Sequence, residues 1–341
     1  MLDFIRREKI YILMFLFILT VNFMNSSQAK KEAVDEEKAL SSMTFEELGV
    51  TEERVKDFFE SEKPGAVFFK YAISLGFFIF LVALLSNLVF IFRKKKISFE
   101  GLSDKAPPSW DILDVAKVSI IVVFTAYIIG MLEALILKRL NIEMSMNLGM
   151  IFGTFFVDIA AAIVIIYFVM IKYREKLQAL GLRSSSFFRN VLTGISSYIF
   201  LLPILLAVLL FSIWILNLFG YSPPPQPVFE AFMEEKRSRV LLFLTIFVSV
   251  FGPLVEEMFF RGFMYSAIKK RMGVLAAAFL SAAVFSLLHA NIVGFLPIMA
   301  LGVLLAYLYE TTGSLVASMT VHILHNSAII CFVFFIKQLL A

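Results

Sequence analysis

Long apolar runs separated by short polar stretches make up most of the chain from residue 66 onward. Most of them approach the ~20 residues that an α-helix needs to cross a bilayer. Eight such runs lie at 66–92, 117–137, 147–171, 191–219, 240–265, 274–291, 293–309 and 314–336. The pattern predicts an all-α, polytopic membrane protein with about eight transmembrane helices. The sixth and seventh runs are only marginally long, and we expect them to form a tight, buried hairpin.

The amino terminus has the pattern of a secretory signal peptide. Basic residues at positions 6, 7 and 9 precede an apolar run, and a small-residue motif ends at Ala29. An uncleaved extra membrane helix is the alternative. The apolar run of ~15 residues would rise only ~22 Å, which is less than the ~30 Å thickness of the hydrocarbon core. We therefore favour a signal peptide over residues 1–29.

Residues 30–65 differ in character from the rest of the chain. Between residues 30 and 63 there are eleven acidic and six basic side chains, whereas the whole chain has a net charge of +4. Thr44 and Thr51 are each followed by glutamates, a pattern typical of helix N-termini. We expect this region to be a small exported helical segment ahead of a transmembrane domain at 66–341.

Lysines and arginines beside the apolar runs set the predicted orientation. When the loop after the first run is placed inside the cell, fourteen of these residues lie on the cytoplasmic side and six on the opposite side. This distribution predicts an exported amino-terminal region. It indicates a multi-pass protein of the cell membrane, or of the inner membrane in a cell that has two.

Composition narrows the possible partners. Hydrophobic residues make up 60% of the chain and charged residues 17%, so the excess apolar surface has to face lipid. The basic residues lie beside apolar runs, so we interpret the positive charge as setting the orientation of the helices in the membrane. We expect no nucleic-acid partner. Because Cys331 is the one cysteine of the chain, an internal disulfide cannot form. All three histidines fall within the last 53 residues, inside apolar segments.

Ionisable side chains inside apolar runs are candidates for function, because each costs about 2.5–3.5 kcal/mol on insertion scales. Glu257 and Arg261 are four residues apart in the fifth run, with the acid first, and this spacing predicts an ion pair. Glu256 points about 100° away from Glu257 and has no partner on its own helix. We expect Glu256 to be a desolvated carboxylate of raised basicity.

Two later runs bring further polar groups to a similar depth. His289 ends the sixth run, and His322 and Asn326 share one helix face of the eighth. A carboxylate, two imidazoles and a carboxamide are the groups needed to activate water and stabilise an oxyanion. Each motif alone is explained equally well by helix packing, and only their combination favours chemistry. Two further acids, Glu133 and Asp158, are better explained as contacts to neighbouring helices.

Three motifs in this order resemble the signature of the CAAX-protease and bacteriocin-processing (CPBP, or Abi) family, which includes the type II CAAX prenyl endopeptidases. The motifs are Glu256-Glu257-x-x-x-Arg261, Phe285-x-x-x-His289 and His322-x-x-x-Asn326. The resemblance covers about residues 180–336. It implies an intramembrane endopeptidase acting on a membrane-associated protein or peptide.

The resemblance also implies a role for each matched residue. Glu256 and His289 would polarise the attacking water, and His322 with Asn326 would stabilise the oxyanion. Glu257, Arg261 and Phe285 would support the site, whereas His325 matches no family position.

The use of a metal stays open at this point. Glu256, His289 and His322 would hold Zn²⁺ with one position left for water. They do not form the compact H-E-x-x-H pair, however, and a glutamate–histidine mechanism needs no metal. We favour the metal-free form and expect no certain cofactor.

Two other functions remain as alternatives. One is a non-catalytic membrane protein that binds a peptide, for example an immunity protein. The other is a transporter, which is less favoured because the ionisable groups gather in one half of the chain and no internal repeat is present.

Overall fold

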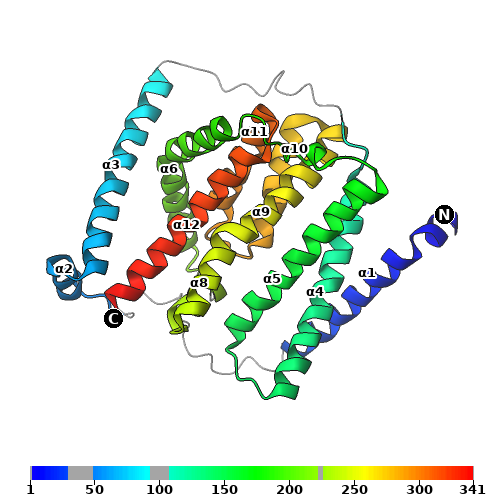
Figure 1. Cartoon of the computed structure of the whole chain (residues 1–341), viewed down its shortest axis with the longest axis horizontal. Coiled ribbons are helices and arrows are strands. Elements are labelled where there is room, and N and C mark those ends of the chain that lie inside the picture. Colours follow the sequence, from blue (N-terminus) through cyan, green and yellow to red (C-terminus); the bar gives the residue numbers. More distant parts are fainter. Residues whose placement is uncertain (1, 30–48, 93–106, 222–225, 341) are drawn as a thin grey trace.

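The computed structural model describes residues 2–29, 49–92, 107–221 and 226–340, and within these ranges the regular structure is helical throughout (Figure 1). The α-helices are α1 (Leu2–Ala29), α2 (Glu52–Glu60), α3 (Pro64–Phe92), α4 (Ile112–Leu140), α5 (Met146–Ile166), α6 (Phe187–Leu218), α7 (Pro227–Glu234), α8 (Ser238–Ile246), α9 (Gly252–Glu257), α10 (Ser266–Leu288), α11 (Phe295–Thr312) and α12 (Leu315–Leu339). Three π-helical segments, η2 (Tyr167–Lys172), η4 (Phe247–Phe251) and η5 (Met258–Tyr265), continue these helices, and η3 (Leu177–Leu180) is a 3₁₀ turn.

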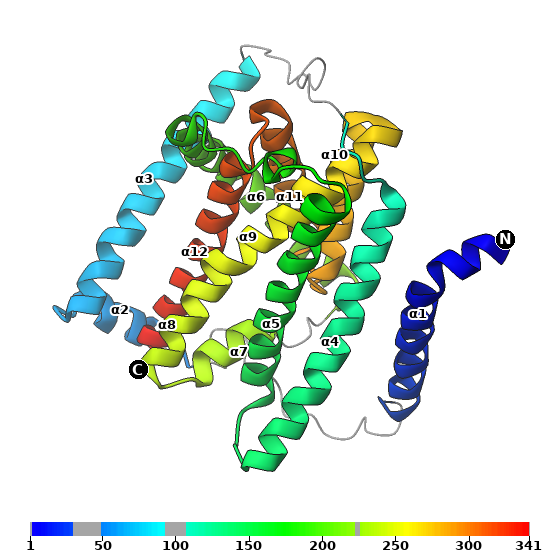
Figure 2. The same ribbon diagram turned by 45° about the vertical axis from the view of Figure 1, so that its right-hand side comes forward.

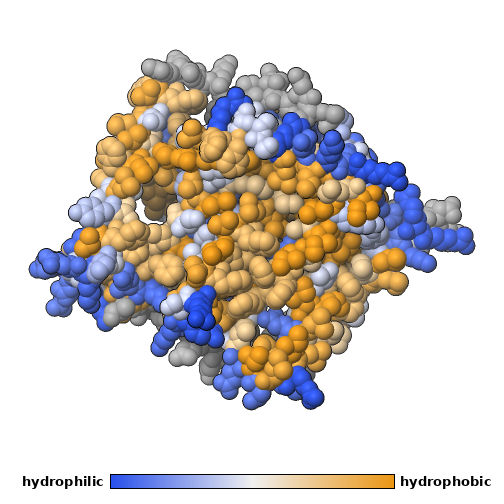
Figure 3. Space-filling model, viewed as in Figure 1, coloured by the Kyte–Doolittle hydropathy of each residue, from blue (hydrophilic) through white to orange (hydrophobic). Residues whose placement is uncertain are grey.

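Seven helical stretches in the described ranges are long and apolar enough to cross a membrane. The prediction of an all-α, polytopic membrane protein is therefore confirmed. The number is seven and not eight because the fifth and sixth apolar runs are counted together as Ser238–Leu288, although the backbone is not helical at Gly273 between them. Gly273 bends the chain within that stretch, with a φ of 81° and a ψ of 175° that a residue without a Cβ adopts easily. Hydrophobic residues cover the middle of the molecule in Figure 3, and hydrophilic ones gather toward the helix ends.

Helices α10 and α11 pack side by side as the predicted tight hairpin. Gly302 allows this approach, since a Cβ added there would lie 2.9 Å from the Cβ of Ala282. A larger residue at position 302 would push the two helices apart. The small residues thus fix the position of α11 beside η5 and α10.

The amino-terminal helix α1 lies along α4 (Figure 2). Glu8 accepts a hydrogen bond from Lys117 Nζ at 2.8 Å, and the ring of Phe17 meets that of Phe124. Removal of residues 1–29 as a signal peptide stays a prediction, as does their alternative role as an extra membrane helix.

The segment that the sequence predicts to be exported contributes one described helix, α2. Thr51 caps it by accepting a hydrogen bond from the backbone N–H of Arg54, which confirms the predicted helix start. The other predicted start, Thr44, lies outside the described residues. The helix packs on the ends of α3 and α12 through the rings of Phe58 and Phe335.

The continuous stretch α8–η4–α9–η5 runs through the bundle between α5 and α12 (Figures 1 and 2). It therefore faces α5 on one side and α12 on the other. This central position brings the acidic motif of the fifth apolar run against the histidines that come later in the chain.

Candidate functional site

A fully buried ion pair forms the base of the site. Arg261 Nη1 donates a hydrogen bond to Glu257 Oε1 at 2.7 Å, and neither side chain is exposed. The same guanidinium donates to the backbone carbonyl of Gly302 at 3.3 Å and lies over the ring of Phe285, 4.4 Å from its centroid. Buried charges are tolerated when they are paired and hydrogen-bonded. This pair, with the spacing that the sequence indicates, ties η5 to α11 and α10.

His322 of α12 lies between the two glutamates of α9. Its Nδ1 is 3.0 Å from Glu257 Oε1, and its Nε2 is 3.6 Å from Glu256 Oε2. A carboxylate only accepts hydrogen bonds, so Nδ1 carries the proton that is shared with Glu257. The Nε2 atom is then left facing Glu256. Glu257 thus orients the imidazole, and Glu256 keeps its hydrogen-bonding capacity for another group.

Glu256 has unused hydrogen-bonding capacity. Its side chain is 33% exposed, yet Oε2 is buried and has no hydrogen-bond partner within the described part of the chain. Glu257 Oε2 and Arg261 Nε are in the same condition. Buried polar atoms in folded proteins normally have partners, so three open ones in a single cluster point to a place for water or a polar ligand.

His289 caps the end of α10 at the edge of the site. Its Nδ1–H donates a hydrogen bond to the carbonyl oxygen of Phe285 at 2.8 Å, and Nε2 is then an acceptor. The Phe285 ring contacts both His289 and His322, at centroid distances of 4.6 and 5.4 Å. Among the described contacts no hydrogen bond joins His289 to Glu256.

Asn326 lies one helical turn beyond His322 on α12. Its Nδ2 donates to the backbone carbonyl of Val248 in η4 at 2.9 Å. A carboxamide has two N–H donors, and the second is available to a ligand. The acceptor is in a π-helical segment, and such segments occur frequently at functional sites.

Asp158 of α5 lies beside the site, although the sequence alone favours a packing role for it. A Cβ added at Gly252 would meet Asp158 Oδ2 at 3.7 Å, and the carboxyl interacts electrostatically with Glu256. Helical side chains lean toward the helix N-terminus, so Glu256 leans over the turn of Gly252, where Asp158 lies. The one signal in the sequence is an acid in the middle of an apolar run.

His325 belongs to a different contact. Its Nδ1 lies 3.4 Å from the hydroxyl of Tyr198 on α6. With regard to a metal, the described His, Cys, Asp and Glu side chains include no group of three or more placed to hold one ion. Glu256, His289 and His322 therefore do not form a ready-made zinc site in this arrangement.

The comparisons with known proteins fall on this part of the chain. Residues 238–328 match the family described as "Type II CAAX prenyl endopeptidase Rce1-like". This stretch is similar to the CAAX endopeptidase family. The Rce1-like stretch runs from α8 into α12, so it contains the whole cluster from Glu256 to Asn326. The family resemblance that the three motifs carry is confirmed.

A curated relative points the same way. Over 87 residues the chain is 26% identical to "Putative membrane peptidase YdiL" of Bacillus subtilis (strain 168), a match that covers 26% of this chain. It spans 36% of that relative's length. No solved structure matches the chain. Together with the seven apolar helices, these similarities describe a multi-pass membrane protein related to membrane peptidases.

Proposed function

We propose that the chain is an intramembrane endopeptidase that hydrolyses a peptide bond of a membrane-associated protein or peptide. One observation carries the proposal: Glu256 presents a buried, unpartnered carboxylate oxygen beside His322, which Glu257 holds in place. The Rce1-like stretch that contains these residues supports hydrolysis as the reaction. We also propose that the protein lies in the cell membrane with its amino-terminal region exported, as the distribution of basic residues indicates.

In the first step, Glu256 accepts a proton from a water molecule while the water oxygen attacks the carbonyl carbon of the substrate. The Nε2 atom of His289 accepts a hydrogen bond from the same water, because its Nδ1 proton is engaged by Phe285. General-base catalysis of this kind contributes roughly 10²- to 10⁴-fold to the rate. A C–O bond forms and the carbonyl electrons move onto the substrate oxygen.

In the second step, the resulting oxyanion is stabilised by hydrogen-bond donors on α12. The free N–H of Asn326 is one donor, and Nε2–H of a protonated His322 is the other. Glu256 and Glu257 lie on either side of that imidazole, so a positive charge on it would have two carboxylates close by. When the C–N bond breaks, the protonated Glu256 returns its proton to the leaving amine nitrogen, which balances the reaction.

The remaining residues position these groups. Glu257 orients His322, Arg261 neutralises Glu257, and Phe285 separates the two imidazoles. No step runs through a metal, and we propose a metal-free reaction. Treatment with a strong chelator would then leave cleavage unchanged. Loss of activity that Zn²⁺ restores would instead support a metal held by Glu256, His289 and His322.

The direct test uses the purified protein in lipid vesicles and a set of membrane peptides, identified as those that accumulate uncut in cells carrying Glu256→Gln. We expect cleavage by the wild type and none by Glu256→Gln or His289→Ala, with all proteins folded. Glu133→Gln is the matched control, because Glu133 is an intramembrane carboxyl that lines a separate groove between α4 and α5. Full function of Glu256→Gln in cells would favour a non-catalytic peptide-binding or immunity protein.

A further inference from the structure

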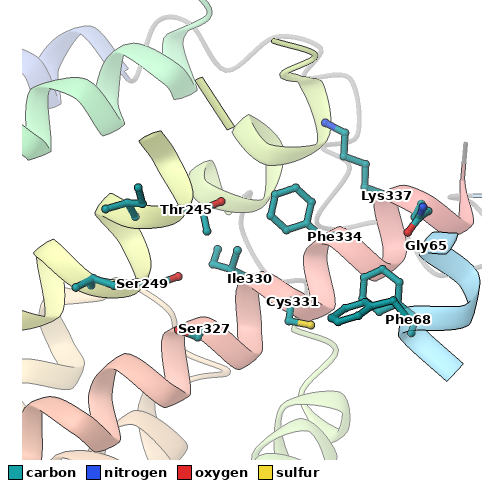
Figure 4. Close-up of a pocket in the computed structure, with 13 residues that line it drawn as sticks. Gly65, Phe68, Thr245, Ser249, Ser327, Ile330, Cys331, Phe334 and Lys337 are labelled. Carbon is teal, nitrogen blue, oxygen red and sulfur yellow. The ribbon is translucent and has the colours of Figure 1, made fainter. Parts of the chain in front are cut away.

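An apolar groove lies along the second half of α12, toward the end of the bundle that carries α2 (Figure 4). It has a volume of about 790 Å³ and lies between the start of α3, the α8–η4 helix and α12. Its apolar walls include Phe68, Ile330 and Phe334. This volume lies within the range of ~300–1,000 Å³ that is typical of ligand sites.

The inner end of the groove adjoins the proposed oxyanion donors. Ser249 and Ser327 line it there, and each directly follows a residue of the Val248–Asn326 hydrogen bond in the sequence. Glu256 is not among its described lining residues. The groove therefore continues the site along α12 and does not duplicate it.

Small polar side chains face each other across this groove. Thr245 and Ser249 lie four residues apart on one wall, and Ser327 and Cys331 lie four residues apart on the opposite wall. Ser249 is only 4% exposed, and its hydroxyl has no hydrogen-bond partner among the described residues. Burying a hydroxyl without a partner is costly. The groove is therefore suited to a ligand that has hydrogen-bond acceptors as well as apolar groups.

An unwound peptide has this chemistry, and a lipid acyl chain lacks it. A peptide bond is accessible to water only where the helix is opened, and opened backbone in the membrane needs hydrogen-bond partners. From Ser327 to Lys337 the rise along α12 is ~15 Å, which equals four to five extended residues at ~3.3–3.6 Å each. The groove thus has the length for a short flanking segment.

We propose that the groove holds an unwound, apolar segment of about four to five residues that flanks the cleaved bond of the substrate, with Ser249 donating to one of its backbone carbonyls. This inference rests on the proposed function and gives it a substrate class. The preferred substrate is a membrane peptide with a short apolar run on one side of the cleavage position. In the proposed orientation, the groove admits it from the exported side.

Cys331 is the one cysteine of the chain, so it offers a native probe of the groove. The protein is labelled with a benzyl thiosulfonate and offered two substrates with the same cleavage position, one with the apolar flank and one short and water-soluble. We expect labelling to lower cleavage of the flanked peptide about tenfold and to leave the short one unchanged. The Cys331→Ala protein should be insensitive to the reagent. Equal cleavage of the flanked peptide before and after labelling would overturn the proposal.

A second pair of variants covers the case of poor labelling. Cys331→Trp fills the groove, whereas Ile329→Trp places the same ring on an exposed face of α12. Only the first should discriminate against the flanked peptide, and equal behaviour of the two variants would contradict the proposal.

If the wild type cleaves neither peptide, the proposed function fails. The groove is then judged by whether the flanked peptide protects Cys331 from the reagent beyond what phospholipid vesicles alone achieve, and no added protection would overturn it.

Discussion

Two clusters of buried charge in the same bundle are built differently. Near the end of the bundle, Glu310 has both carboxylate oxygens paired: Oε1 lies 2.5 Å from Lys269 Nζ, and Oε2 accepts from the Tyr265 hydroxyl at 2.9 Å. In the middle of the bundle, Glu256 Oε2 and Glu257 Oε2 have no hydrogen-bond partner among the described residues.

The difference separates a structural role from a chemical one. In a paired cluster each carboxylate oxygen already has a protein partner, so its burial needs no ligand. An incompletely paired cluster costs stability, and such violations are expected where function requires them. The comparison therefore assigns Glu310 to the fold and Glu256 to the reaction.

The largest expected effect is on Glu256. Replacing it with glutamine removes the proton acceptor, and we expect cleavage to fall roughly 10²- to 10⁴-fold without loss of folding. Glu310→Gln should behave in the opposite way, with a lower melting temperature and retained turnover. Peptide cleavage and thermal unfolding, measured on both proteins in the same detergent, check this. If Glu310→Gln abolishes turnover in a folded protein, the division between the clusters is wrong.

Arg261→Met tests the buried pair. It leaves Glu257 as an uncompensated charge at a fully buried position, and loss of one partner of a buried pair costs about 3–5 kcal/mol. Lys269→Met is the matched variant, and it should cost less because Lys269 is partly exposed and lines a polar cavity. Chemical unfolding of both variants gives the comparison. Equal losses would show that burial does not distinguish the two pairs.

The Glu257–Arg261 pair could be predicted from the sequence, whereas the groups around it could not. The four-residue spacing on one helix is local, so the link between Glu257 and Arg261 follows from helix geometry. The position of His322 between two glutamates depends on how α12 packs against α9, 65 residues away in sequence. The hydrophobic periodicity of the sequence does not indicate that these two segments lie next to each other.

The fold shows the same limit. The apolar runs predict the spans well, because a bilayer imposes their length. They do not reveal that the chain kinks at Gly273, nor that Asp158 of α5 lies close to Glu256. Val248, whose carbonyl accepts the hydrogen bond from Asn326, lies in a π-helical segment. Such a segment shifts the helical register, so a helical period of 3.6 residues does not predict this contact.

Asp158→Asn sharpens the comparison within the site. Its carboxyl lies against the turn that Glu256 leans over and interacts electrostatically with Glu256, so we expect its replacement to lower kcat about tenfold with little change in KM. The melting temperature should stay within a few degrees of the wild type, because the described residues form no hydrogen bond with this carboxyl. A large loss of stability at unchanged kcat would return Asp158 to a packing role.

The smallest expected effect concerns an ion pair outside the membrane-spanning stretches. The hydrogen bonds from the Arg237 guanidinium lower the pKa of Glu235 to about 2, from the ordinary value of about 4.5 for a glutamate. Because the folded-state pKa is depressed, the stabilisation is present above pH ~4.5 and is lost as the pH falls toward ~2. A small drop in melting temperature over this window should be absent in Glu235→Gln. An identical acid response in both proteins would contradict this assignment.

The most direct test of the central claim is the origin of the oxygen in the new carboxyl terminus. A membrane peptide is incubated in heavy-oxygen water with the wild type and with Glu256→Gln, and the products are examined by mass spectrometry. The account predicts one heavy oxygen at a single new carboxyl terminus for the wild type and no product for the variant. Equal amounts of the same labelled product from both proteins would contradict it.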